Sequence, residues 1–491
     1  MAEQSYALRR IDSRAAAVTM VAVLGAYGSA LLLAHMTHQH AQLMVLAVVL
    51  TLTLERTQRT ADRAHRVRTL VLLPLIAVAA SQVGPLLVHH PNAGDALFVI
   101  AIAGSIWVRR FGSAAARAGT LVALPFIALL TTPIVAAPGS DDPTLWAAVV
   151  AVIAFTWVTA LHLATGSFGA ADEAGAQPRP SAARRLPAST RMAVQMGLSL
   201  GIAFAAGRAL FPAHWSWVVL TAFIVASGNR GRADVLHKSG LRIAGALAGT
   251  IAATLLAGRI APGEPITVVA IFVVLAAATW LRPLSYAFWA AGITAVLALL
   301  NGYFGERGDE LLGQRLLGIL VGAAIAVAAA WLVLPVRTTD VLRRRIADAL
   351  AALSDVIAGR ETGSAAHRFA GTVEALEQIA RPLRLQRRLR AGAHRADAID
   401  AVAACAAPVA TLATAPAERL TRHDTRRHLG QLARDVGAIR RHIGGKAPAP
   451  PADRVAIPSG DDAVSEALAE LDAALTRLAT VPLGPRGYFQ K

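Results

Sequence analysis

The segment from residue 312 to residue 336 reads LGQRLLGILVGAAIAVAAAWLVLPV, and its one charged side chain is Arg315. A helix needs about 20 apolar residues to cross a hydrocarbon layer of ~30 Å, so this segment can span a membrane. Eleven segments before it are similarly apolar: 15–36, 41–54, 69–88, 94–108, 118–137, 144–164, 191–210, 214–228, 241–258, 265–281 and 284–300. The sequence therefore predicts an all-α membrane protein with about twelve spans, or ten if the shortest segments do not cross.

The composition of the 491 residues agrees with this class of protein. Hydrophobic residues make up 55% and charged residues only 16%, whereas about 25% of the residues in a soluble domain are charged. The single cysteine, Cys405, excludes a disulfide framework and any Cys-based metal cluster. The sequence has no Walker loop, and no HExxH motif, nucleophile elbow or carboxylate pair appears in a plausible setting. We therefore expect no enzyme, no cofactor and no metal site.

The net charge of +17 would favour nucleic-acid binding in a soluble protein. Here the basic residues fall in the gaps between apolar segments and in the part of the chain after residue 337, so no nucleic-acid partner is expected. If the N-terminus with Arg9 and Arg10 is cytoplasmic, the predicted outer loops contain only two basic residues, Arg259 and Arg307. This bias predicts a multi-pass plasma (inner) membrane protein whose N-terminus, central linker and C-terminal tail are cytoplasmic.

An internal repeat divides the apolar part of the chain. The run Ala61-Asp62-Arg63-Ala64-His65-Arg66 aligns with Ala233-Asp234-Val235-Leu236-His237-Lys238 at an offset of 172 residues, and the same offset relates several apolar segments. We predict two parallel six-helix transmembrane repeats, residues 1–164 and 191–336, joined by a cytoplasmic linker at 165–190. Parallel repeats are a known transporter architecture, with the substrate bound between the halves.

The stretch from Trp215 to Thr250 carries a family resemblance. It contains a Trp-containing apolar helix, then a basic loop, then Lys238, Gly240, Arg242, Gly245, Gly249 and Thr250 in a Lys-x-Gly-x-Arg-x-x-Gly-x-x-x-Gly-Thr pattern. This pattern resembles the fusaric-acid-resistance-like (FUSC) membrane family, which includes bacterial aromatic acid exporters, and is similar to the plant aluminium-activated malate transporters. The resemblance implies export of small organic anions, above all aromatic carboxylates.

Arginines in or beside the apolar segments are the candidate anion ligands, because a guanidinium binds a carboxylate through two parallel hydrogen bonds. Each also has a purely structural interpretation, in which its side chain extends to the lipid headgroups. Trp217 is either an interfacial tryptophan or an aromatic contact for the substrate. The predicted substrate-binding residues are Arg242, Arg208, Arg315, Trp217 and Lys238. His162 and His214 could couple transport to protons, although a structural role is the commoner one for a single histidine.

Three pairs of glycines spaced four residues apart are predicted to let neighbouring helices approach closely. They are Gly245 and Gly249, Gly197 and Gly201, and Gly318 and Gly322.

Residues 337–491 show apolar side chains at helical spacing and are predicted to form a cytoplasmic helical bundle. Its basic runs, Arg343-Arg344-Arg345 and 384–390, are expected to face anionic headgroups of the bilayer. A homo-oligomer and an accessory efflux subunit remain open as further partners.

Three functions are compatible with these features. The leading hypothesis is a transporter that exports small organic anions through an arginine-lined path between the repeats. The alternatives are a major-facilitator-type carrier and a membrane scaffold that transports nothing and recruits a partner through its tail. Asp62-Arg63 lacks the flanking glycines that the facilitator motif requires, which argues against the first alternative.

Overall fold

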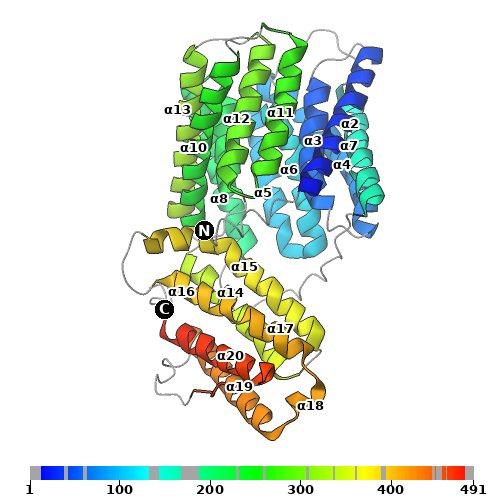
Figure 1. Cartoon of the computed structure of the whole chain (residues 1–491). Helices are drawn as coiled ribbons and strands as arrows, with labels where there is room; N and C mark the ends of the chain where they lie inside the picture. Colours follow the sequence, from blue (N-terminus) through cyan, green and yellow to red (C-terminus); the bar gives the residue numbers. More distant parts are fainter. Residues whose placement is uncertain are drawn as a thin grey trace. The chain divides into compact units, whose positions relative to one another are not determined.

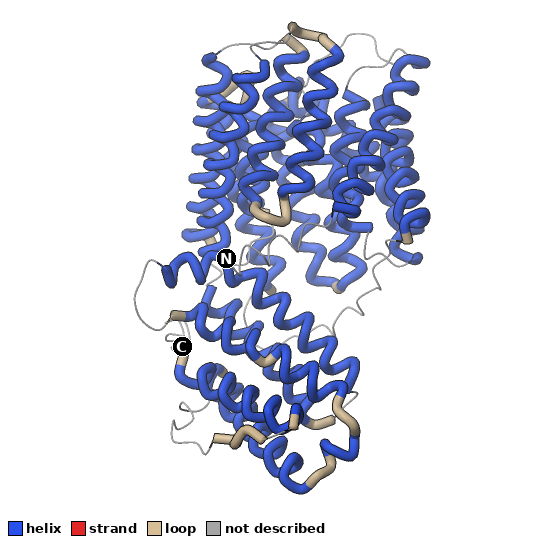
Figure 2. Tube along the Cα trace, in the orientation of Figure 1, coloured by secondary structure: helices blue, strands red, loops and turns tan. Residues whose placement is uncertain are grey.

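The computed structural model describes residues 13–37, 42–58, 63–131, 143–166, 187–227, 232–257, 261–305, 309–334, 338–359, 362–388, 394–444, 448, 456–460 and 462–481. Within these ranges the chain consists of helices and their connections, and no strand occurs (Figure 2). The predicted anchor at Arg9 and Arg10, most of the linker 165–190 and several predicted loops, including Arg259 and Arg307, lie outside the described residues.

The contacts divide the chain into two compact units. The first holds residues 1–229 and 235–334, so both predicted repeats belong to a single unit. The second holds residues 230–234 and 335–491, and it begins two residues before the predicted boundary at residue 337.

The first unit is a bundle of helices that run up and down past one another (Figure 1). In the described part of residues 13–334, every predicted apolar segment coincides with one α-helix. These are α2 (Ser13–Thr37), α3 (Gln42–Gln58), α4 (Arg63–His89), α5 (Pro91–Trp107), α6 (Ser113–Thr131), α7 (Pro143–Thr165), α8 (Ala188–Leu210), α9 (Trp215–Ala226), α10 (Arg232–Ala257), α11 (Pro265–Leu281), α12 (Tyr286–Tyr303) and α13 (Asp309–Leu332).

The order and the packing of these helices recur along the chain. Helix α3 begins at residue 42 and α9 at residue 215, a separation of 173 residues; α6 and α12 begin at 113 and 286, again 173 apart. Helices α2, α3 and α7 contact one another, and so do α8, α9 and α13. Likewise α5 contacts α6, and α11 contacts α12. These contacts therefore occur both among helices of residues 13–165 and among helices of residues 188–332.

Seven of these twelve helices are long and apolar enough to cross a membrane, whereas α3, α6, α9 and α11 are apolar but shorter, and α10 falls in neither group. An eighth apolar stretch of sufficient length, Arg395–Thr414, lies in the second unit. There it is divided into α16 (Arg395–Ala404) and α17 (Ala406–Thr414), and its apolar side chains belong to the core of that unit.

An aromatic core joins the two halves of the first unit. The ring of Phe98 on α5 lies 5.3 Å from the ring of Phe126 on α6 and 5.4 Å from that of Phe204 on α8. Phe204 in turn lies 5.4 Å from Trp215 on α9. Aromatic pairs at such distances stabilise a core beyond the area they bury, so helices of the first half are fixed against helices of the second half.

The second unit is a separate helical bundle with its own apolar core. Besides α16 and α17 it contains α14 (Thr338–Ile357), α15 (Thr362–Arg388), α18 (Ala417–Leu420), α19 (His423–Ile443) and α20 (Ala463–Thr480). The predicted apolar stripes supply this core, for example Leu342, Phe369, Leu432 and Leu471.

Part of the predicted headgroup-facing basic run is paired inside the second unit. Arg384 donates to both oxygens of Glu377 at 2.8 Å and to Oδ1 of Asp400 at 2.6 Å. Arg387 donates to Asp397 and to Asp400, each at 2.7 Å. These two guanidinium groups join α15 to α16, so their charge is balanced by carboxylates of the same unit.

Candidate functional site

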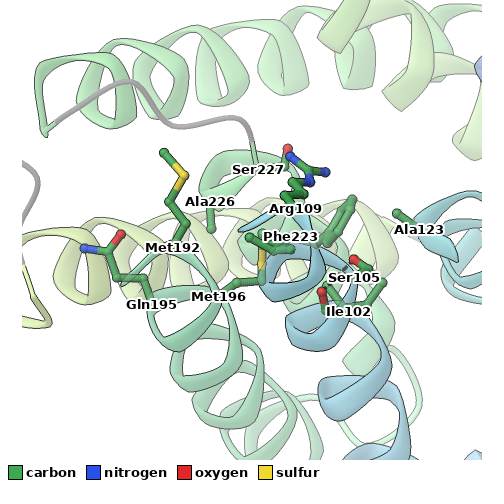
Figure 3. A pocket seen from close by; sticks show the side chains of 11 residues that line it. Ile102, Ser105, Arg109, Ala123, Met192, Gln195, Met196, Phe223, Ala226 and Ser227 are labelled. Atoms are coloured by element: carbon green, nitrogen blue, oxygen red, sulfur yellow. Dashed lines mark hydrogen bonds between the residues drawn. The ribbon is translucent and has the colours of Figure 1, made fainter. Parts of the chain in front are cut away.

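A cavity of about 60 Å³ lies between the predicted halves of the first unit. Its lining comes from α5, α6 and the short 3-10 helix η1 (Val108–Phe111) on one side, and from α8 and α9 on the other. Figure 3 shows Met192, Gln195 and Met196 of α8 facing Ile102 and Ser105 of α5, with Arg109 and Phe223 between them. The cavity is thus formed where the end of α5 meets the beginning of α8.

Arg109 is the one charged residue among the side chains that line this cavity. The hydroxyls of Ser105 and Ser227 donate to carbonyl oxygens of their own helices, at Ile102 (2.7 Å) and Ile224 (2.9 Å). Gln195 donates to the carbonyl of Val333 at 2.6 Å. The polar neighbours therefore have hydrogen-bond partners within the protein, and Arg109 supplies the net positive charge.

The other walls of the cavity are apolar and adaptable. Met192 and Met196 line one side and Phe223 closes it from α9. Methionine side chains are flexible and polarisable and readily pack against aromatic rings. One guanidinium beside methionine and phenylalanine surfaces can bind a small amphipathic anion. A drug-sized ligand needs about 300–1,000 Å³, so the helices must move apart to admit one.

Arg208 is held by a carboxylate of the other half of the unit. It donates to Asp95 from Nε at 2.7 Å and from NH2 at 2.6 Å, and to the carbonyl of Leu87 at 3.0 Å. Its guanidinium also lies 4.5 Å from the ring centre of Trp215. The charge of Arg208 is thus balanced in this conformation, and Asp95 is a membrane-segment carboxylate that the sequence analysis overlooked.

Trp217 is buried rather than lipid-facing, with 9% of its surface exposed. The guanidinium of Arg315, which is 3% exposed, lies 4.7 Å from its ring centre. The ring of His214 stacks on the same indole with centres 4.2 Å apart. The structure therefore brings three of the predicted site residues into one cluster near the beginnings of α9 and α13.

Arg242 is also buried inside the protein, with 3% of its surface exposed. Tyr286 at the start of α12 interacts with it electrostatically. Lys238, one turn earlier on α10, donates to the carbonyl of Ser227 at 3.3 Å and so caps the end of α9. His162 on α7 is 1% exposed and lies on a different helix from the Trp217 cluster.

The predicted glycine pairs differ in what they contact. A Cβ on Gly245 would lie 2.5 Å from the carbonyl oxygen of Ala287, and one on Gly249 would collide with the backbone of Ala291, both on α12. A Cβ on Gly322 would likewise collide with Val218 on α9, whereas Gly318 and Gly197 have only ordinary contacts. Gly201 has no atom within 4 Å of that position. Close approach therefore occurs at Gly245, Gly249 and Gly322.

The sequence analysis missed the cavity residues Arg109, Gln195 and Phe223 as functional candidates. In the sequence, Arg109 is one of the basic residues that fall in the gaps between apolar segments. The signal that could have found it is the repeat itself, because Trp107-Val108-Arg109 aligns with Trp280-Leu281-Arg282. Both arginines follow the fourth helix of their predicted half, α5 and α11.

The multiple apolar helices of membrane-crossing length are typical of a multi-pass membrane protein. Residues 199–329 match the family model described as fusaric acid resistance protein-like, from the middle of α8 to near the end of α13. Residues 199–329 are thus similar to the fusaric acid resistance protein-like family, and the resemblance seen in residues 215–250 is confirmed. The comparisons with curated proteins and with solved structures found no match.

Proposed function

We propose that the protein exports small organic anions, in particular aromatic carboxylates, across the plasma membrane. The observation that carries this proposal is the cavity between α5 and α8, in which Arg109 lies beside Met192, Met196 and Phe223. A guanidinium can hold the carboxylate while the methionine and phenylalanine side chains cover an aromatic ring. The match to the fusaric acid resistance protein-like family over residues 199–329 supports the same function.

The proposed path runs between the two halves of the first unit. Arg109 and Lys238 belong to the end of the bundle that the distribution of basic residues places in the cytoplasm. Arg208, Arg315 and Trp217 belong to the opposite end. In this scheme the solute enters at the Arg109 cavity and leaves past Trp217, with the N-terminus, linker and tail all cytoplasmic. The ion that drives export is left open, and His162 and His214 are the candidates for proton coupling.

Efflux from proteoliposomes tests this function. Vesicles containing the purified full chain are loaded with labelled 4-hydroxybenzoate, and efflux is compared with that from protein-free vesicles. Arg109→Gln should lower efflux about tenfold or more, since a hydrogen bond to a charged group contributes about 1.5–3 kcal/mol. The matched control is Arg110→Gln, because Arg110 is exposed and contacts Trp107 and Phe111 rather than the cavity.

Two results would contradict the proposal in different ways. Efflux from wild-type vesicles no faster than from protein-free vesicles would rule out transport of this solute class. If wild-type efflux is fast and Arg109→Gln does not slow it, the protein transports the solute but the cavity is not its binding site. Arg242→Ala in the same assay reports on the remainder of the arginine-lined path.

A further inference from the structure

Arg242 lies in an unusual environment for a charged side chain. Only 3% of the surface of Arg242 is exposed to solvent. Its Nε has no hydrogen-bond partner among the described residues, and no described carboxylate pairs with it. A buried charge without a counter-charge is strongly disfavoured. The environment of Arg242 therefore favours an anion as its partner.

The start of helix α12 lies beside Arg242. Gly245, one turn further along the same face of α10, approaches the carbonyl of Ala287 so closely that a Cβ would lie 2.5 Å from it. Ala287 is the second residue of α12, and Tyr286, the electrostatic neighbour of Arg242, is the first. The two helices run next to each other in Figure 1. Close packing at the glycines thus brings the guanidinium to the N-terminus of an 18-residue helix.

This N-terminus adds positive potential to that of the guanidinium. The backbone N–H groups of the first turn carry roughly half a positive charge between them. Ser285 caps one of them, accepting from the N–H of Ala287 at 3.2 Å. Arg282 precedes this turn, and its guanidinium lies 4.8 Å from the ring centre of Trp289 on α12. One buried guanidinium together with a helix N-terminus balances a single negative charge well.

We propose that Arg242, Tyr286 and the N-terminus of α12 form a binding site for a monovalent anion. Its ligand is a carboxylate or a halide of similar charge, held by the guanidinium fork and the first turn of the helix. The site is separate from the cavity at Arg109, because that cavity is lined by α5, α6, α8 and α9 and by no residue of α10 or α12. The proposal requires binding only, so it does not depend on whether the protein transports the anion.

Thermal unfolding of the detergent-purified full chain tests this site. Sodium benzoate and sodium chloride are titrated at constant ionic strength against sodium sulfate, and the unfolding midpoint is recorded. The wild type should show a saturable rise in midpoint with one or both monovalent anions, because a ligand that binds the folded state stabilises it. A rise with benzoate alone identifies a carboxylate site; a rise with both identifies a general monovalent-anion site.

Three variants assign the effect to Arg242. Arg109→Gln removes any contribution of the cavity to the rise, and adding Arg242→Gln to it should abolish the rise that remains, while the exposed control Arg110→Gln should keep the full rise. The proposal is overturned if the wild type shows no saturable rise with either anion, or if Arg242→Gln keeps it in full.

If Arg242→Gln does not fold, Arg242→Lys and Tyr286→Phe replace it. Each should raise the half-saturating anion concentration at least severalfold, and an unchanged value in both overturns the site. The unfolding midpoint is measured independently of efflux. If wild-type vesicles show no efflux but the Arg242-dependent rise in midpoint is present, the proposed function is refuted and the anion site is retained.

Discussion

Arg208 and Asp95 are joined by two parallel hydrogen bonds, from Nε to Oδ2 at 2.7 Å and from NH2 to Oδ1 at 2.6 Å. Asp95 lies near the start of α5 and Arg208 in the last turn of α8, so this ion pair links one predicted half of the first unit to the other. Trp215 covers the guanidinium at 4.5 Å. Both side chains are largely buried, at 25% and 16% exposure, and an ion pair of this kind resists the separation of its two helices.

The Arg208–Asp95 pair predicts a loss of stability when either partner is removed. Asp95→Asn and Arg208→Gln should each lower the free energy of unfolding by about 1–3 kcal/mol, because the remaining charge loses its partner. The measurement is thermal or SDS unfolding of the purified chain, with the exposed Arg68→Gln as control. The double change Asp95→Asn with Arg208→Gln should cost less than the two single changes together. Additive losses would show that the two residues do not act as a pair.

The glycines of α8, α10 and α13 allow a matched comparison. Gly249→Ala and Gly322→Ala should each destabilise the bundle by about 1–3 kcal/mol, because the new methyl group collides with the backbone of the facing helix. Gly201→Ala should be neutral or stabilising by up to about 1 kcal/mol, since its surroundings are open and alanine favours the helix. SDS unfolding measures all three. Equal effects at Gly201 and Gly249 would contradict the observed packing.

The cavity at Arg109 predicts sensitivity to side-chain volume. Met192→Trp should fill a space of about 60 Å³ and strongly reduce efflux of aromatic carboxylates, with little change in the unfolding midpoint because Met192 is only half-buried. Leu198→Trp is the matched control, since Leu198 lies on the exposed face of the same helix at 46% exposure. Unchanged efflux in Met192→Trp would place the solute path elsewhere.

Helix α20 in the second unit predicts a dependence on pH. Hydrogen bonds from the side chain of Ser465 and from its N–H, the latter at 2.7 Å, hold the pKa of the Asp462 carboxyl below its usual value of 3.8. A group whose pKa is lowered by folding stabilises the fold above its ordinary pKa, and the effect is lost as the pH falls through the lowered value. Asp462 should therefore protect the first turn of α20 at neutral pH and cease to do so in strong acid.

Hydrogen exchange of peptides from residues 463–480 measures this effect. Asp462→Ala should exchange faster than the wild type at pH 7, and the ratio of the two rates should approach one as the pH is lowered toward about 2. Glu470→Ala, an exposed position on the same helix, should match the wild type throughout. A ratio that stays constant with pH would mean that the carboxylate is not the cap.

The helices of this protein follow directly from its sequence. Segments 265–281 and 144–164 were predicted to within one residue of α11 and α7, because a long apolar run between polar breaks leaves the backbone no alternative to helical hydrogen bonds in an apolar environment. The starts of α9 and α12 follow those of α3 and α6 by 173 residues, one more than the offset of 172 found in the sequence. The apolar stripes of the tail predicted its core for the same reason, since their spacing puts them on one helix face.

The residues that pair with the arginines could not be predicted from the sequence. Whether Arg208 pairs with Asp95, or Arg242 meets the first turn of α12, depends on which helices are neighbours and how each is rotated about its axis. Sequence periodicity gives the face of a helix but not the helix that covers it, and residues 113 positions apart, such as Arg208 and Asp95, give no local signal. The amino-acid order determined the helices and their repetition; only tertiary packing decided which charges are balanced and where a cavity is left.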